Sequence, residues 1–239
     1  MSTKKEIDLN KVVVFTGAGI SVESGLKTYN EETGHWHDTP VRKVATKAAL
    51  NRNPEVVIDF WNERKKEMIE AKPNAAHIAI AELEKYFDVT VITTNVDNLH
   101  EKAGSTNVIH IHGDVSYARS QVDLTEQVYI GDNLLSPSMR CLNGERLRPD
   151  VVMYDEFPYH LDEASDAMRT AARVLVIGSS LSVKPACNIP KKARGRADKI
   201  IVAHNVLKKP FGYRLIRENA STAVPRIVER WLKLSGKLD

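Results

Sequence analysis

The feature that most constrains the fold of this chain is an apolar run that leads directly into a glycine-rich turn. The run occupies residues 12–15 (VVVF), and the turn occupies residues 17–25 (GAGISVESG). This pattern is typical of a buried parallel strand that passes through a tight turn into a helix. It predicts an α/β fold.

The glycine-rich turn is also a candidate binding site for a phosphate group. Glycines let the backbone bend sharply and let a ligand approach its N–H groups. The first turn of a helix adds unpaired donors and the positive end of the helix dipole. A dinucleotide would bind here, although Val22 stands where the dinucleotide fingerprint has its third glycine. On this motif alone, a turn without a ligand remains the alternative.

Further apolar runs end in small or polar residues, and we expect them to be strands. They occupy residues 89–93, 108–111, 174–177 and 200–203. Alternating stretches predict helices at residues 54–70, from Pro73 onward, at 161–173 and at 224–234. Asn53 is a candidate cap for the first of them. The core candidates of the first two helices are Val57, Phe60, Trp61, Met68, Ile78, Ile80, Leu83 and Phe87. Together these elements predict a parallel sheet with helices on both faces.

Short motifs follow one another in a fixed order along most of the chain. They are GAGIS-x-ESG at residues 17–25, T-x-N-x-D-N-L-H at 93–100, H-x-H-G at 110–113, RPDVV at 148–152 and GSSL-x-V-x-P-A at 178–186. In this order they resemble the sirtuins, the family of NAD-dependent protein deacylases. Residues 34–36 and 60–65 are similar to the short prokaryotic branch of that family.

The resemblance implies a Rossmann-like NAD-binding domain that carries a smaller inserted module. The large domain would comprise residues 1–25, 72–114 and 149–239, and the module residues 26–71 and 115–148. NAD and an acyl-lysine protein or peptide would bind between the two. The expected reaction removes the acyl group and releases nicotinamide and O-acyl-ADP-ribose.

Cysteine content separates this chain from many sirtuins. Many members hold a zinc ribbon with two CxxC pairs, but residues 115–147 here contain only Cys141 and no histidine. Because a structural zinc needs four ligands, we expect no structural zinc and a metal-free module instead. Cys187 is the other cysteine of the chain, so a disulfide framework is also excluded.

Charge and hydropathy narrow the expected partners and location. The net charge is only +3, so we expect no nucleic acid partner, and the basic residues 191–196 are interpreted as a solvated loop. No apolar run approaches the ~20 residues of a membrane span, so we expect no membrane partner. Residues 1–6 contain no apolar leader core, which predicts a cytoplasmic protein. The sequence leaves the oligomeric state open.

The resemblance assigns the catalytic roles to His112 and Asn95. An imidazole titrates near neutral pH, so His112 can accept a proton from a ribose hydroxyl. The alternative is a histidine that is merely bonded to a neighbouring carbonyl. His110 has the same parity along the strand, and only the following Gly113 selects His112. Asn95 would orient a water or a ribose hydroxyl.

The resemblance also assigns the remaining contacts. Asp97 would bind the nicotinamide amide, cap the following helix, or do both. The other expected NAD contacts are Gly17, Ala18, Gly19, Ser21, Glu23, Thr28, Tyr29, Thr94, Gly178, Ser179, Ser180 and Asn205. The expected substrate-binding residues are Val152, Tyr154, Asp155 and Glu156.

Departures from the family pattern keep other functions open. Asn30, Thr94 and Asp155 stand where the family usually has arginine, glutamine and glycine. They support an alternative in which the chain is an NAD hydrolase or a protein ADP-ribosyltransferase. A non-catalytic NAD sensor is a third hypothesis. A Rossmann dehydrogenase is disfavoured, because no acidic residue closes a second strand about 20 residues after the turn.

Overall fold

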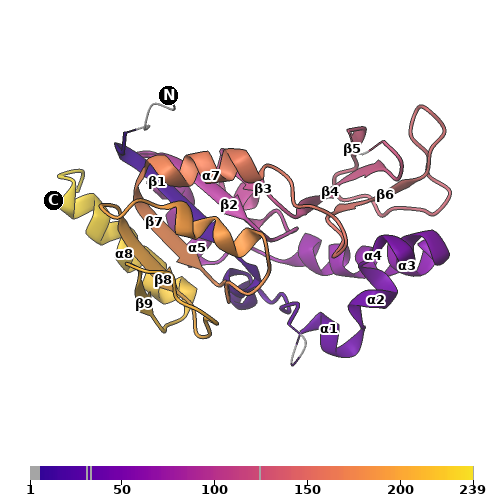
Figure 1. The fold of residues 1–239 in the computed structure, drawn as a ribbon, viewed down its shortest axis with the longest axis horizontal. Coiled ribbons are helices and arrows are strands. Elements are labelled where there is room, and N and C mark those ends of the chain that lie inside the picture. Colours follow the sequence, from indigo (N-terminus) through magenta and orange to yellow (C-terminus); the bar gives the residue numbers. More distant parts are fainter. Residues whose placement is uncertain (1–5, 31, 33, 124, 239) are drawn as a thin grey trace.

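The protein is described by a computed structural model that covers residues 6–30, 32, 34–123 and 125–238. In this range the chain forms a large part around a six-stranded sheet and a small part around a three-stranded sheet (Figure 1). The expectation about a leader falls almost wholly on residues 1–5, which lie outside the described range.

The large sheet is parallel and has the strand order of a Rossmann fold. Its order is β3-β2-β1-β7-β8-β9, and every neighbouring pair is parallel. The strands are β1 (Asp8–Thr16), β2 (Asp88–Thr93), β3 (Val108–His110), β7 (Ala171–Ile177), β8 (Asp198–Val202) and β9 (Arg214–Ile216). The chain order reverses between β1 and β7, and α/β proteins bind ligands at such a switch point. The predicted parallel sheet is confirmed.

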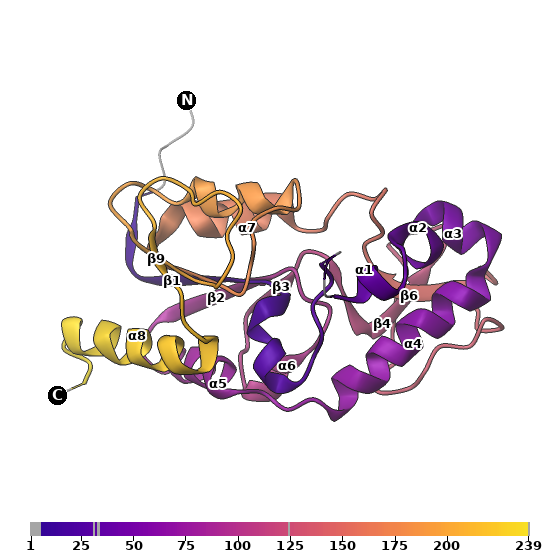
Figure 2. The same ribbon diagram turned by 90° about the horizontal axis from the view of Figure 1, so that it is seen from below.

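Helices cover both faces of this sheet (Figure 2). Alternate residues of β1 point to opposite faces, as the twofold period of a strand requires. Val12 and Val14 pack against α5 (Ala75–Leu83) and α8 (Ala220–Leu234). Val13 and Phe15 pack on the other face with α7 (Leu161–Thr170).

The small part combines an antiparallel sheet with four helices. Its sheet has the order β5-β4-β6. The elements are β4 (Gly113–Ser120), β5 (Gln127–Tyr129), β6 (Leu147–Val151), α1 (His35–Asp38), α2 (Val41–Val44), α3 (Lys47–Arg52) and α4 (Pro54–Glu70). β4 begins at Gly113 and β6 ends at Val151, close to the domain boundaries at residues 114 and 149 that the sequence predicts. The boundaries themselves stay a prediction.

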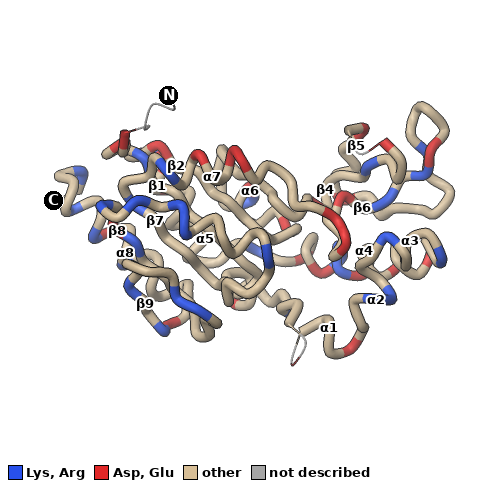
Figure 3. The backbone as a smooth tube through the Cα atoms, viewed as in Figure 1, with Lys and Arg blue, Asp and Glu red and all other residues tan. Residues whose placement is uncertain are grey.

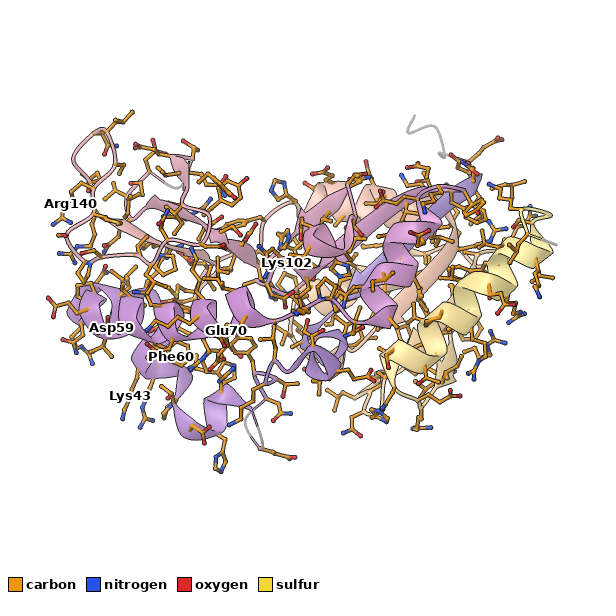
Figure 4. The ribbon with its side chains drawn as sticks, turned by 180° about the vertical axis from the view of Figure 1, so that it is seen from behind. Lys43, Asp59, Phe60, Glu70, Lys102 and Arg140 are labelled. Carbon is orange, nitrogen blue, oxygen red and sulfur yellow. The ribbon has the colours of Figure 1, made fainter. Side chains whose placement is uncertain are left out.

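Lys102 joins the two parts. It lies in α6 (Leu99–Ala103), and its Nζ donates to the carbonyls of Met68, Ile69 and Ala71 at 2.8, 3.1 and 3.4 Å. A cation at this position satisfies the unpaired carbonyls at the end of α4. Figure 4 shows Lys102 in the region where the large and small parts meet. The long helix of the small part is thereby anchored beside the large sheet.

Hydrogen bonds and apolar packing hold described residues of the segment 115–147, which corresponds to the zinc ribbon of many sirtuins. The Ser120 Oγ accepts the N–H groups of Val122 and Asp123 at 3.2 and 3.0 Å. Cys141 is buried in a cluster with Ile58, Ala118, Leu135 and Leu147. Over the described residues, no group of three or more histidine, cysteine, aspartate or glutamate side chains could hold a metal ion.

The prediction that the glycine-rich turn leads directly into a helix is wrong. Residues 17–25 themselves form two short 3-10 turns, at Ala18–Ile20 and Val22–Ser24. The second turn ends at Gly25, whose φ of 92° lies in the left-handed region. A residue in this conformation terminates a helical turn, so the chain leaves toward the small part.

Two helix boundaries differ from the predicted ones because tertiary contacts decide them. The third predicted helix ends at Thr170, since Arg173 pairs with Val12 of β1 and with Asp198 of β8. The last helix begins at Ala220 rather than at residue 224. Its first turn is stabilised by the Glu23 carboxylate, which accepts the Ser221 N–H at 2.9 Å.

Helices α4 and α5 largely follow the sequence pattern. The expected core residues are buried or half-buried except Ile78, which is 49 % exposed. Ile78 lies on the face of α5 that points away from the sheet, so this core assignment is wrong. The Asn74 side chain accepts the Ala76 N–H at 3.0 Å and caps α5. Asn53 holds the cap position of α4 but makes no capping bond with its side chain.

No helix in the part of the chain that the structure describes is long and apolar enough to cross a membrane. Positive and negative residues are interspersed along both parts of the molecule (Figure 3).

Candidate active site

The candidate site begins where the loops after β1 and β7 interlock at the switch point. The Gly17 and Gly19 N–H groups donate to the carbonyls of Ile177 and Gly178 at 3.0 and 2.8 Å. A Cβ atom on Gly19 would lie 2.7 Å from the Gly178 carbonyl oxygen, and one on Gly178 would lie 2.1 Å from the Ile20 nitrogen. The glycines are therefore required for the close approach of the two loops.

The loop after β1 already uses most of its amides internally. The Ile20 and Ser21 N–H groups donate to the carbonyls of Gly17 and Ala18, both at 3.1 Å. The Ser21 amide is thus bonded within the turn, and the expected contact of Ser21 with NAD stays a prediction. The Ala18 N–H has no hydrogen bond within the described structure and remains available to a ligand.

Asn95, Asp97 and Ser21 form one buried hydrogen-bonded group at the end of β2. The Ser21 Oγ donates to Asp97 Oδ2 at 3.0 Å, and Asn95 Nδ2 donates to Ser21 Oγ at 3.2 Å. The Leu99 N–H donates to Asp97 Oδ1 at 3.2 Å. Burial raises the pKa of Asp97, while the bonds from Leu99 and Ser21 oppose the rise. Asp97 thus accepts the first amide of the following helix, whose cap position is held by Asn98, and its contact with nicotinamide stays a prediction.

Two buried polar atoms beside this group lack a hydrogen-bond partner within the described residues. They are Asn95 Oδ1 and the Tyr29 hydroxyl. Burial, followed by the charge of Asp97, raises the pKa of Tyr29, so the phenol keeps its proton and can donate it. Unpaired buried polar groups are costly and point to a bound molecule. An acceptor and a donor at this place fit the hydroxyl and amide groups of NAD.

Tyr29 is held in place by the aromatic side chains of the small part. Its ring lies 5.0 Å from the ring of His35 and 5.2 Å from that of Trp36, between centroids. The adjacent Thr28 is fixed through its carbonyl, which accepts the His35 N–H at 2.8 Å. Asn30 closes the next turn, because its Oδ1 accepts the Gly34 N–H at 3.0 Å.

The structure separates the two histidines of the H-x-H-G motif. His110 bonds the Asn95 carbonyl at 3.1 Å and Glu101 Oε1 at 2.9 Å. Burial lowers the pKa of His110, but the hydrogen bond and charge of Glu101 outweigh it and raise the value to about 9. Burial lowers the pKa of His112 to about 4, against a smaller opposing effect of the Thr94 backbone. His112 is therefore neutral at pH 7 and can accept a proton, whereas His110 is already charged.

The segment expected to bind substrate runs directly beside His112. The Val152 N–H donates to the His112 carbonyl at 2.9 Å, and the Tyr154 N–H donates to the Ala45 carbonyl at 2.9 Å. The two carboxylates of the segment are occupied. Asp155 accepts the Lys47 N–H at the start of α3, at 2.9 and 3.2 Å.

Glu156 is a structural residue of this segment. Its Oε2 pairs with Arg148 Nη2 at 2.8 Å, and the two side chains are only 5 % and 2 % exposed. A charge this deeply buried needs such a partner. The ion pair ties the segment to β6, so a direct contact of Glu156 with substrate stays a prediction.

The other expected NAD contacts lie around the same edge of the sheet, mostly with partners of their own. Thr94 Oγ1 donates to the Thr16 carbonyl at 3.1 Å, which holds β2 to β1. Ser179 Oγ accepts the Leu181 N–H at 3.3 Å, and Ser180 Oγ lies 2.8 Å from Ser182 Oγ. Asn205 follows β8 and is exposed. Glu23 is committed to α8, as described above.

The sequence did not predict the series of hydrogen-bonded side chains that lies behind Asn95. The Asn95 N–H donates to Thr93 Oγ1 at 3.0 Å, and Thr16 Oγ1 donates to the same atom at 2.8 Å. Thr16 Oγ1 lies 3.0 Å from His100 Nε2. Two signals were present: Thr93 and His100 belong to the motif that carries Asn95, and Thr16 interrupts an otherwise apolar strand end.

Comparisons with known proteins agree with this arrangement. The model of the Sir2 family matches residues 17–185, which span the glycine-rich turn, Asn95 and His112. The chain belongs to the Sir2 family.

Relatives and solved structures give the extent of this similarity. An NAD-dependent protein deacylase of Aggregatibacter actinomycetemcomitans is 44 % identical over 194 residues, which cover 81 % of this chain and 92 % of that protein. The structure of a mutant Sir2 homologue with ADP-ribose has a TM-score of 0.85 and 32 % identity, covering 99 % of this chain and 98 % of the other. A Sir2 complex with a p53 peptide and NAD+ has a TM-score of 0.71 and 28 % identity, covering 94 % and 93 %.

Proposed function

We propose that this Sir2-family protein is an NAD-dependent protein deacylase. The observation that carries the proposal is the neutral, half-buried His112, which adjoins the predicted substrate segment and is bonded to the backbone of Thr94, the residue before Asn95. Related proteins with this name and Sir2 structures holding NAD+ or ADP-ribose support NAD as the cosubstrate.

The residues of the site supply binding, orientation and one proton acceptor. NAD, when bound, supplies a labile bond to a good leaving group. The Ala18 N–H, the Tyr29 hydroxyl and Asn95 Oδ1 are the groups that would hold it, because each lacks a partner within the described residues. One imidazole nitrogen of His112 accepts a proton from a hydroxyl group. Ser21 fixes Asp97 and Asn95 relative to one another.

The substrate is an acyl-lysine in an extended protein segment. Residues 152–156 run beside His112, and an extended peptide would add along such a segment through its main chain. The Sir2 structure with a p53 peptide supports this class of substrate. We expect the enzyme to act in the cytoplasm, because Cys141 and Cys187 are both unpaired.

The departures from the family pattern do not favour NAD hydrolysis or ADP-ribosyl transfer. Each of the three side chains has a local structural role. Thr94 holds β1, Asp155 holds the start of α3, and Asn30 closes a turn. None of these contacts opens the site to water or to another acceptor.

The test is nicotinamide release from NAD by the purified protein, with and without an acetyl-lysine peptide. We expect release that depends on the peptide and produces the deacetylated peptide in equal amount. Nicotinamide release at the same rate without the peptide would contradict the deacylase function and support NAD hydrolysis instead. A series of acyl chain lengths extends the assay, so that a preference for another acyl group is not mistaken for inactivity.

A further inference from the structure

A groove on the small part lies next to the predicted substrate segment but outside the reaction centre. It has a volume of ≈ 630 Å³ and lies on α2, α3 and the start of α4. Its lining includes Arg42, Lys43, Ala49, Arg52, Val56 and Asp155. A groove of this size takes a few side chains of a peptide rather than a folded domain.

Positive charge surrounds an apolar floor in this groove. Arg42, Lys43 and Arg52 are exposed, and none of them has an ion pair or hydrogen bond to another part of the described chain. Many other surface cations are paired, as Lys27 is with Asp38. Ala49 is buried below them, and Val56 is 51 % exposed. Figure 4 shows Lys43 extending outward from the side of the small part that carries α2.

The carboxylate of Asp155, which also lines the groove, offsets only part of this charge. Both oxygens of Asp155 face the Lys47 N–H at the start of α3. A carboxylate at this end of a helix is stabilised by the unpaired amides and the dipole. The neighbouring Glu156 is buried against Arg148. With three cations against one carboxylate, the lining of the groove keeps a net positive charge beside residues 152–156.

We propose that this groove binds acidic residues that flank the acyl-lysine of the substrate protein. The inference rests on the proposed deacylase function, because that function places the substrate along residues 152–156. Asp155 belongs both to that segment and to the groove. An extended peptide advances about 3.3 Å per residue, so side chains a few positions from the acyl-lysine reach the three cations. The groove makes the enzyme selective for acyl-lysines in acidic surroundings.

The expected effect lies in substrate affinity. Each exposed ion pair contributes little to the free energy of binding, but we expect three together to change KM by roughly tenfold. Pairs of this kind accelerate encounter more than they slow dissociation, and salt screens them. The selectivity should therefore appear in KM rather than in kcat and should weaken at high ionic strength.

The experiment compares two acetyl-lysine peptides that differ only in their flanks, one with aspartate and glutamate, the other with asparagine and glutamine. Deacetylation kinetics are measured for the natural protein and for the triple variant Arg42→Gln, Lys43→Gln, Arg52→Gln. The matched control is Lys191→Gln, Lys192→Gln, Arg194→Gln, which removes the same charge from the large part. We expect a KM roughly tenfold lower for the acidic peptide in the natural and control proteins, and equal values in the groove variant.

Equal KM values for both peptides in the natural protein would overturn the proposal, as would a preference that survives the groove substitutions. Binding of the same fluorescein-labelled peptides, followed by anisotropy, tests the groove even without turnover. Charge-selective binding that needs the three cations, together with no turnover, would support the groove and contradict the deacylase function. Tighter binding of a single-stranded RNA of equal charge would also overturn the proposal. Melting curves show whether the variants are folded.

Discussion

At the scale of single residues, the environment of each imidazole decides its chemistry. His110 and His112 are two positions apart, yet Glu101 keeps one charged and burial keeps the other neutral. His110 bonds the carbonyl of Asn95 and so positions the residue whose Oδ1 is buried without a partner within the described residues. The motif thus contains a structural cation and a proton acceptor with separate roles.

This division of roles predicts the acid limb of the pH profile. A base must be neutral to act, and the pKa of His112 is about 4, so activity is retained as pH falls and is lost only near that value. We expect kcat/KM for deacylation to stay level from pH 8 to ~5. Rates are measured in short assays and divided by the folded fraction. The control is His110→Gln, which should lower the rate but leave unchanged the pH at which activity falls on the acid side. A limb near 6.5 would contradict the proposed environment of His112.

At the scale of elements, the interlocked loops after β1 and β7 build the switch point. Their close approach depends on glycine at positions where any side chain would collide with backbone. The loops have no regular helix to support them, and their own hydrogen bonds fix them instead. The geometry of the candidate site therefore depends directly on this contact.

Substitution of Gly178 by alanine tests the contact. Its φ is +62°, and the new Cβ would lie 2.1 Å from the Ile20 nitrogen, so the loops must separate. We expect a loss of about 3–5 kcal/mol in the free energy of unfolding. Gly144→Ala is the matched control, because Gly144 has a φ of +85° with nothing within 4 Å, and it should cost only about 1 kcal/mol. Equal losses in urea denaturation would show that the loops tolerate separation.

Asp155→Gly, which restores the usual residue of the family, tests the contact between the substrate segment and α3. The change removes the acceptor for the Lys47 N–H. We expect a loss of about 1 kcal/mol in the free energy of unfolding, measured by urea denaturation. Asp155→Asn keeps an acceptor without the charge and should lose less. A glycine variant as stable as the natural protein would show that Asp155 does not cap α3.

The sequence pattern predicted the elements more reliably than their ends. Apolar runs located five of the six strands of the large sheet, because burial on both faces leaves a clear signal. They did not predict β9, a three-residue strand that is exposed or half-buried. The boundary at Thr170 and the start at Ala220 depend on partners far along the chain, namely β1 and Glu23. The motifs selected His112 and Asn95, but only the three-dimensional structure shows why His110 cannot replace His112. The partners of Thr94 and Asp155 lie in other elements, so no local pattern could reveal them.

At the scale of the whole molecule, a buried pair of neutral histidines packs between α5 and α6. His77 and His100 are fully buried, with ring centroids 5.0 Å apart. Burial lowers the pKa of His77 to about 4, and it lowers the pKa of His100 well below its usual range. Through Thr16 and Thr93, His100 is also connected to Asn95. Acid stability and site geometry are therefore linked.

The histidine pair predicts a loss of stability in mild acid. In the unfolded chain both imidazoles bind a proton near pH 6.5, whereas the folded protein keeps His77 neutral down to about 4. Their contribution is intact above pH 6.5 and is lost as pH falls toward 4, on the order of 3 kcal/mol for His77. Urea titrations between pH 7 and 4 measure this slope. His77→Gln should reduce the slope, with His100 and His112 accounting for the remainder, and the exposed His37→Gln should leave it unchanged. An equal slope in both variants would place the acid sensitivity elsewhere.

We propose that His112 and Asn95 act on NAD and an acyl-lysine to remove the acyl group. The most direct measurement is mass spectrometry of the products formed from NAD and an acetyl-lysine peptide by the natural protein and by His112→Ala. The account predicts O-acetyl-ADP-ribose and nicotinamide in equal amounts, and a loss of at least about 100-fold in the variant while it still binds NAD. Free ADP-ribose with the peptide left acetylated, or an unchanged rate in His112→Ala, would contradict it.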